Sequence, residues 1–393
     1  MRPSIRTSIL AAALALVAAG AALAAPQTRQ IHETFAWSPG QTLRLANLAG
    51  RVDLEPVHGG PLVVDGTIHA EGADAAETQK LLAGMIFVKS RDGKGRDEMA
   101  LAYPVEKYHA FHFPRPERDS DIPSWLSFFA ESSSSTTYRG QKVRIYSRKR
   151  SGAPTLYADL RISVPVGSDV AIRNAIGAIR GGDLEGALSV DTGSGDVRLA
   201  SFAGRLSVDT GSGDVKLDSA RGETTIKTGS GNIVVGHLVG NGVVETGSGD
   251  VVLDQVAAGK LKLDTGSGNV TVKEGAVMTL VADTGSGDVR LTGLDMEELT
   301  ADTGSGNVTL ESSLAKAKKV VIETGSGDVR IAAGDAASFD LDSDQGSGDL
   351  RVEYADAVLR RNRHKVVGAK RGDGKTHIHV ETGSGDCTIK PQQ

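Results

Sequence analysis

The chain has 393 residues, a formal net charge of −5, a single cysteine and an aromatic content of only 4%. The acidic balance argues against nucleic acid as a partner, and one cysteine rules out an intramolecular disulfide framework. A hydrophobic core and hydrogen bonds must therefore hold the fold together.

Residues 1–24 have the features of a secretory signal peptide. Arg2 and Arg6 precede an apolar stretch, Ile9–Leu23, and the small residues Ala22 and Ala24 form a cleavage site. We expect an exported protein that is periplasmic, extracellular or located at the cell surface. No later stretch is apolar enough to predict a transmembrane segment.

Residues 25–100 are predicted to form an N-terminal β-rich unit. Thr42–Asn47 and Gly50–Leu54 alternate apolar and polar residues on either side of a short turn, which is typical of two short strands. Pro61–His69 continues the alternation. This part of the chain therefore already contains an imperfect version of a strand, turn and strand unit.

One short helix is expected near the N-terminal end, over residues 74–82. Asp74 is a good N-cap residue, Glu77 follows at the spacing of a capping box, and Gly84 lies beyond the expected end. We expect the helix to cap an open end of the β-structure, where unpaired strand edges would otherwise favour aggregation.

Residues 101–157 are predicted to be an aromatic and serine-rich insertion. The segment contains ten of the sixteen aromatic residues: Tyr103, Tyr108, Phe111, Phe113, Trp125, Phe128, Phe129, Tyr138, Tyr146 and Tyr157. A run of four serines, Ser132–Ser135, adds polar low complexity. We interpret the insertion as a docking segment, with Trp125, Phe128 and Phe129 as candidate partner contacts.

A short phrase recurs throughout residues 158–393. Thr-Gly-Ser-Gly followed by Asp or Asn begins at Thr192, Thr210, Thr228, Thr246, Thr265, Thr284, Thr303, Thr324 and Thr382, with an altered copy at Gln345. The starts lie 18 to 21 residues apart, apart from a last interval of 37 when Gln345 is included. A fixed period of this size indicates stacked repeats. We therefore predict an all-β, single-chain β-solenoid of 18–21-residue coils.

Period-two alternation between the phrases predicts two columns of inward side chains. The first column is Val197, Val215, Ile233, Val251, Val270, Val289, Val308, Val329, Leu350 and Cys387. The second is Leu199, Leu217, Val235, Leu253, Val272, Leu291, Leu310, Ile331, Val352 and Ile389. These columns should form a narrow aliphatic core, and Cys387 should be a buried, inert thiol.

The long interval before the last phrase is predicted to hold one coil and a basic excursion. The excursion, from residue 360 to residue 375, should be a polar hairpin or loop. Its arginines Arg360, Arg361 and Arg363 are further candidate partner contacts.

Asp-Thr-Gly-Ser, the signature of aspartic proteases, occurs at Asp191, Asp209, Asp264, Asp283 and Asp302. Such enzymes need two aspartates that face each other, and a row of copies along a solenoid does not provide this geometry. Two explanations remain for the acidic columns: the carboxylates accept turn amides, or they form a row of cation sites. No catalytic residue, cofactor site or metal site is predicted.

The Asn47–Leu54 unit, the Ser163–Gly167 entry and the Thr-Gly-Ser-Gly-Asp-Val array resemble a bacterial family of unknown function, labelled putative adhesin, whose members are exported β-strand-repeat proteins. The resemblance implies a β-solenoid without established catalytic residues. It favours a non-enzymatic, adhesin-like scaffold or binding module of the cell envelope, with an envelope protein or a glycan as partner. A polysaccharide lyase-like β-helix enzyme and a filament-forming structural protein are the alternatives.

Overall fold

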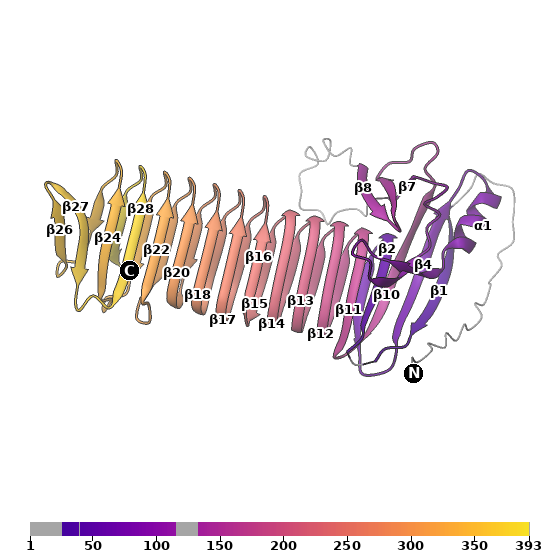
Figure 1. The fold of residues 1–393 in the computed structure, drawn as a ribbon, viewed down its shortest axis with the longest axis horizontal. Coiled ribbons are helices and arrows are strands. Elements are labelled where there is room, and N and C mark those ends of the chain that lie inside the picture. The colour runs from indigo at the N-terminus through magenta and orange to yellow at the C-terminus, as the bar shows by residue number, and fades with distance from the viewer. Residues whose placement is uncertain (1–25, 39, 115–132, 393) are drawn as a thin grey trace.

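The computed structural model describes residues 26–38, 40–114 and 133–392. These residues form an all-β solenoid with one short helix, which confirms the predicted fold class. Figure 1 shows the strands stacked side by side in a long array, with the helix at the N-terminal end. The predicted signal peptide lies outside the described residues.

The N-terminal part contains α1 (Ala75–Gly84) and the strands β1 (Gln27–Phe35), β2 (Thr42–Ala49), β3 (Val52–Val57), β4 (Leu62–Glu71), β5 (Phe87–Arg91), β6 (Asp97–Leu101), β7 (Ala110–His112), β8 (Ser133–Tyr138) and β9 (Gln141–Tyr146). The array begins with β10 (Thr155–Pro165), β11 (Ser168–Ile176), β12 (Ile179–Ser194), β13 (Val197–Ser212), β14 (Val215–Ser230), β15 (Ile233–Val239), β16 (Gly242–Thr246), β17 (Val251–Thr265) and β18 (Val270–Thr284). It ends with β19 (Val289–Thr292), β20 (Leu294–Thr303), β21 (Val308–Ser312), β22 (Lys319–Thr324), β23 (Val329–Ala333), β24 (Phe339–Gln345), β25 (Leu350–Val352), β26 (Val358–Asn362), β27 (Lys365–Arg371), β28 (Thr376–Thr382) and β29 (Cys387–Pro391).

Each coil contributes one strand run to each of two facing sheets. We call the sheet whose runs end at the threonine of the phrase, such as Leu206–Thr210, the Thr sheet. The Val sheet consists of the runs that begin after the phrase, such as Val215–Leu217. Coils pair in parallel and in register, so that Val208 lies between Val190 and Ile226.

The predicted inward columns form the core between the two sheets. All ten residues of the first column are buried, and so are those of the second, except for the half-buried Val352. Cys387 is buried as predicted, and burial raises the pKa of its thiol to about 12. Aliphatic side chains repeated at every level thus provide the continuous core that a solenoid requires.

The repeats at the C-terminal end are stacked out of chain order. β28 pairs in parallel with β22 on one side and with β24 on the other, and β29 lies in the same way between β23 and β25. Figure 1 shows β28 in this position. The final coil therefore fills a slot between two coils that precede it in the sequence, an arrangement that sequential stacking of the repeats does not predict.

A hairpin forms the outer end of the array. Among the described strands, β26 pairs only with β27, and β27 pairs antiparallel with β24. The basic excursion is therefore a hairpin, one of the two forms predicted for it. The last coil is inserted between the coil of β22 and the coil of β24. This hairpin and the coil of β24 and β25 therefore lie outermost, although they are not last in the chain.

A similar interleaving occurs at the N-terminal end. β3 pairs in parallel with β10 on one side and with the start of β12 on the other, while β2 pairs with β11. The imperfect unit predicted from Thr42 to Leu54 is therefore a true coil of the solenoid. Beyond it, β4 and β1 extend the Val sheet as antiparallel strands.

Helix α1 begins at the predicted N-cap. The amide of Glu77 donates to Asp74 Oδ1 (2.7 Å), and Glu77 Oε2 accepts the amide of Ala73 (2.6 Å). Gly84, expected beyond a helix end at residue 82, is the last residue of the helix. Arg29 of β1 donates to the carbonyl of Leu82 (2.9 Å), which ties the end of the helix to the edge strand.

The largest buried aromatic residues of the predicted insertion pack into the N-terminal end of the core. The Tyr103 ring makes edge-to-face contacts with Phe111 and Tyr138, with centroid distances of 5.8 and 5.7 Å. The Tyr138 hydroxyl donates to the carbonyls of Ala46 (3.0 Å) and Leu101 (2.8 Å). These side chains close the core and do not form a docking surface.

Candidate functional site

The threonine of the repeated phrase is a structural residue. The buried hydroxyl of Thr246 donates to the carbonyl of Gly231 in the preceding coil (2.9 Å) and accepts the amide of Gly249 in its own turn (3.2 Å). The same two bonds recur at Thr265, Thr284, Thr303, Thr324 and Thr382. In these coils the hydroxyl is therefore engaged in turn formation and stacking.

The second glycine of the phrase is required by the close approach of successive turns. A Cβ on Gly249 would lie 1.9 Å from the carbonyl oxygen of Gly231, a distance that no side chain tolerates. Gly268 stands in the same relation to Gly249. The Gly-Ser-Gly sequence thus provides the space in which neighbouring turns stack.

The Asp-Thr-Gly phrases do not form a catalytic dyad. Asp264, Asp283 and Asp302 are register partners in neighbouring strands of the Thr sheet, so their side chains lie side by side on one face. An aspartic protease needs two carboxylates that approach from opposite sides and share a proton. The resemblance to the protease signature is therefore a product of the repeat.

The residue that follows each Gly-Ser-Gly forms a column of bonds between coils. Asp214 Oδ1 accepts the amide of Asn232 (2.8 Å), and Asn232 Oδ1 accepts the amide of Asp250 (2.9 Å). The same bond continues along the column from Asp196 to Asp349. Of the two explanations for the acidic residues, acceptance of turn amides is the one observed in this column.

Asparagine and arginine reduce the charge of this Asp/Asn column. Asn269 lies between two aspartates and donates its side-chain amide to Asp250 (3.3 Å). Where aspartates are neighbours, arginines pair with them, as Arg330 does with Asp328 (2.8 Å). The asparagines and arginines thus lower the net negative charge of the column.

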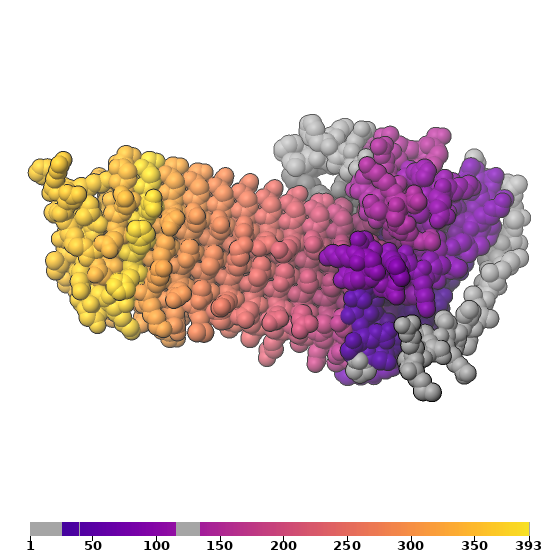
Figure 2. Space-filling model, viewed as in Figure 1, coloured from indigo at the N-terminus to yellow at the C-terminus, as the bar shows by residue number. Residues whose placement is uncertain are grey.

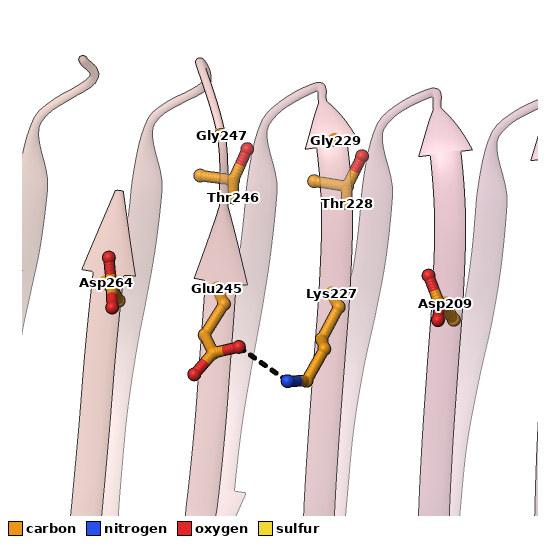
Figure 3. Close-up of a pocket in the computed structure, with 8 residues that line it drawn as sticks. All are labelled: Asp209, Lys227, Thr228, Gly229, Glu245, Thr246, Gly247 and Asp264. Carbon is orange, nitrogen blue, oxygen red and sulfur yellow. Dashed lines mark ion pairs between the residues drawn. The ribbon is translucent and has the colours of Figure 1, made fainter. Parts of the chain in front are cut away.

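A second column, the carboxylate column, precedes the threonines on the outside of the Thr sheet. A shallow depression of about 390 Å³ lies along this column. Figure 3 shows Lys227 between Asp209 and Glu245. Lys227 Nζ lies 2.6 Å from Glu245, and Lys262 reaches Glu245 and Asp264 at 3.0 Å. Hydrogen bonds from the two lysines hold the pKa of Glu245 below its usual range.

The carboxylate column continues as five consecutive exposed acids: Asp283, Asp302, Glu323, Glu381 and Asp344. Within the described residues, none of the five has a salt-bridge partner. Partial desolvation, and then the charges of Asp264 and Asp302, raise the pKa of Asp283. In the part of the chain that the structure describes, no three His, Cys, Asp or Glu side chains are grouped so as to hold a metal ion.

A cleft of about 350 Å³ lies where β7, β8 and β9, together called the flap, face the Gly-Ser-Gly turns of the first coils. Phe113 and Ile145 line it from the side of the flap, and Ser194, Ser212 and Asp214 line it from the turns. Sequence reasoning missed this cleft, because Ser194 and Ser212 stand in the same phrase as their counterparts in every other coil. Only the tertiary structure brings the flap to these particular turns.

The predicted contact residues fall into two groups. Trp125, Phe128 and Phe129 lie outside the described residues. Arg360 is engaged in ion pairs with Asp340 and Asp342, and it also donates to the carbonyl of Leu341 (2.7 Å). Arg361 and Arg363 are exposed on the outer hairpin.

Two pairs of histidines, His109 with His112 and His377 with His379, lie outside the repeated phrases. His112 is buried and lies 2.9 Å from the Thr155 hydroxyl through Nδ1. His377 and His379 are exposed on β28, where they pair in register with Asp340 and Asp342 of β24. None of them belongs to a group with metal-binding geometry among the described residues.

The fold and its columns define a β-solenoid repeat protein, and part of the array is similar to a known family. Residues 222–390 match the family described as Toastrack DUF4097, a domain of unknown function, which confirms the predicted resemblance over this part of the array. No curated protein matches the chain.

Two solved structures are similar at 10% sequence identity. One is described as a putative lipid binding protein from Parabacteroides distasonis, with a TM-score of 0.33, coverage of 93% of this chain and 97% of that chain. The other is described as a putative cell adhesion protein from Clostridium sporogenes, with a TM-score of 0.16 and coverage of 93% and 100%. At these scores neither similarity bears on function.

The described residues contain one helix, α1, and no helix with the length and apolarity needed to cross a bilayer.

Proposed function

We propose that this protein is a non-enzymatic, exported binding scaffold of the bacterial cell envelope, adhesin-like in its use of an extended repeat surface. One observation carries the proposal. The aspartates and threonines of the repeated phrase resemble catalytic groups, but they form bonds between coils or stand in columns of like residues. The outward-facing columns repeat the same side-chain chemistry in successive coils. Such a surface is better suited to binding an extended partner than to catalysis at a single bond.

Export is proposed from the N-terminal sequence. Arg2 and Arg6, the apolar stretch after them and the small residues around Ala24 have the properties of a cleaved signal. Expression of the full sequence in a bacterial host, followed by fractionation and mass measurement of the N-terminus, tests this point. Recovery of an uncleaved chain from the cytoplasm would contradict it.

Filament formation is less well supported than binding. The edge strand β26 carries a register shift at Arg360 and Arg361 and two exposed arginines near its turn. Bulges and positive charges are the usual means by which natural proteins keep edge strands from pairing with other chains. The partner is therefore expected to be an envelope protein or a glycan, not a second solenoid stacked end to end.

The test is a pull-down from envelope extract with the chain from residue 25 onward as bait. Two bait variants locate the contact: one replaces Trp125, Phe128 and Phe129 by serine, and the other replaces Arg361 and Arg363 by glutamine. Retention of a specific envelope component by the unaltered bait supports the scaffold. Depolymerisation of an envelope glycan by the bait would overturn the non-enzymatic assignment.

A further inference from the structure

The cleft beside the flap differs from the rest of the array in its shape. It is bounded on one side by the flap and on the other by the turns of four successive coils, which include Gly177, Gly195, Gly213 and Ser230. Figure 2 shows this part of the N-terminal region projecting above the surface of the array. Elsewhere along the array the turns face outward without a flap against them (Figure 1).

The turns beside the flap also adopt a different conformation from those farther along. Gly195 and Gly213 have φ angles of 150° and 148°, and their amides donate to the carbonyls of Ser212 (2.9 Å) and Ser230 (3.1 Å). In the coils from Thr246 onward, the corresponding glycine amide donates to the threonine hydroxyl.

As a result, two buried hydroxyls in these turns lack partners. Thr192 Oγ1 and Thr210 Oγ1 make no hydrogen bond within the described residues, although the two side chains are 2% and 1% exposed. Unpaired buried hydroxyls are costly. The two phrases with unpaired threonine hydroxyls are those whose serines, Ser194 and Ser212, line the cleft.

One wall of the cleft presents hydrogen-bonding groups, and the opposite wall is apolar. Ser194, Ser212 and Ser230 follow one another in neighbouring coils. Their side chains make no hydrogen bond within the described residues. Asp214 uses Oδ1 to accept the amide of Asn232, which leaves Oδ2 available to a ligand. Phe113 and Ile145 line the cleft from the side of the flap.

We propose that this cleft binds a saccharide without acidic groups. Hydroxyl groups in steps of one coil, roughly 4.8 Å, have a spacing close to the length of one pyranose unit in a glycan chain. A carboxylate oxygen accepts sugar hydroxyls and repels anionic sugars, and an apolar wall contacts the C–H face of the ring. The proposal rests on the proposed binding function and names the ligand class for one site.

The test uses the full mature chain on an array of neutral and acidic glycans, followed by calorimetric titration with the best neutral oligosaccharide. Ser212→Phe fills the cleft, and Ser267→Phe places the same side chain at the equivalent exposed serine of a distant turn. Asp214→Asn removes the carboxylate while keeping its amide-accepting oxygen, and Asp288→Asn is its matched control in a distant coil.

We expect saccharide binding to fall at least about tenfold with Ser212→Phe and to weaken with Asp214→Asn, whereas both controls bind like the unaltered chain. Circular dichroism and thermal unfolding of all four variants establish that they are folded. Equal binding by Ser212→Phe and Ser267→Phe would overturn the assignment of the cleft. Binding of acidic glycans or of peptides in place of neutral glycans would overturn the ligand class.

The two proposals fail in different ways. If no saccharide binds but an envelope component is still retained in the pull-down, the saccharide cleft is wrong and the scaffold stands. If neither experiment yields a partner, both are wrong.

Discussion

The backbone amide of Asp386 donates to Asp328 Oδ1 at 3.0 Å, although the two residues are 58 positions apart in the chain. Everywhere between Asp196 and Asp328 this bond joins successive repeats. Here it joins the final coil to the coil of β22 and β23, and the amide of Asp349 then donates to Asp386 (3.0 Å). The last coil is thus an insert that holds the outer coil and its hairpin on the array.

This arrangement predicts that removal of the last coil is more harmful than removal of the segment before it. Deletion of residues 376–393 takes away the pairing partners of β22 and β24 at once and leaves buried side chains exposed. Replacement of residues 334–375 by residues 313–318, the corner of the preceding coil, should leave β28 and β29 stacked on β22 and β23.

Urea unfolding monitored by circular dichroism compares the two variants. We expect a cooperative transition for the replacement and a weakened or multiphasic transition for the truncation. A truncated chain as stable as the full chain would contradict the interleaved stacking.

Cys387 provides a probe of the same coil. Because burial raises the pKa of its thiol to about 12, the native protein should react slowly with a thiol reagent at pH 8, and rapidly in denaturant. Ile389→Ala, which removes a buried neighbour on the same strand, should speed the native reaction, whereas Val197→Ala in a distant coil should not. Rapid labelling of the unaltered native chain would show that the coil is not held as described.

Thr246→Val should destabilise the fold by about 1–3 kcal/mol, because it leaves the amide of Gly249 and the carbonyl of Gly231 without partners. Thr192→Val is the matched control, and it should be neutral or slightly stabilising because the Thr192 hydroxyl has no partner within the described residues. Chemical denaturation measures both. Equal losses for the two variants would mean that the turns do not differ as the structure shows.

Gly249→Ala should cost at least about 1–3 kcal/mol, because the new Cβ would lie 1.9 Å from the carbonyl oxygen of Gly231. Gly84→Ala introduces the same methyl group at the end of α1, where no atom lies within 4 Å, and should have little effect. The comparison is made by thermal unfolding, and a neutral Gly249→Ala would refute the close stacking of the turns.

Asp283→Asn should raise stability at neutral pH by about 0.5 kcal/mol after screening by solvent. The pKa of Asp283 is raised in the folded state by partial desolvation and by Asp264 and Asp302, so its ionised form opposes folding. This penalty is present above the folded-state pKa and disappears as the pH falls below the unfolded-state value. The difference in stability between variant and parent should therefore vanish in acid, and a difference independent of pH would exclude this cause.

Much of the fold could be predicted because the signal is repeated. The columns headed by Val197 and Leu199, and the turns at each Gly-Ser-Gly, follow from alternation and period alone. The capping box at Asp74 and Glu77 is a local pattern and was also correct. The cleft could not be predicted, because Ser194 and Ser212 are identical in context to the serines of every other phrase, and the flap that faces them comes from a distant, irregular segment.

The period, the side chains that face the core and the chemistry of each outward column can be read from the sequence, since these depend on local alternation and on turns that only glycine permits. The order of the coils and the place of the cleft are set by contacts between segments distant in the chain. The physical reason is that neighbouring coils present the same backbone register and the same inward side chains, so the pairing between any two coils is nearly equivalent. Cys387 thus lies between Val329 and Leu350 in the stack, and the connections and end structures select this order.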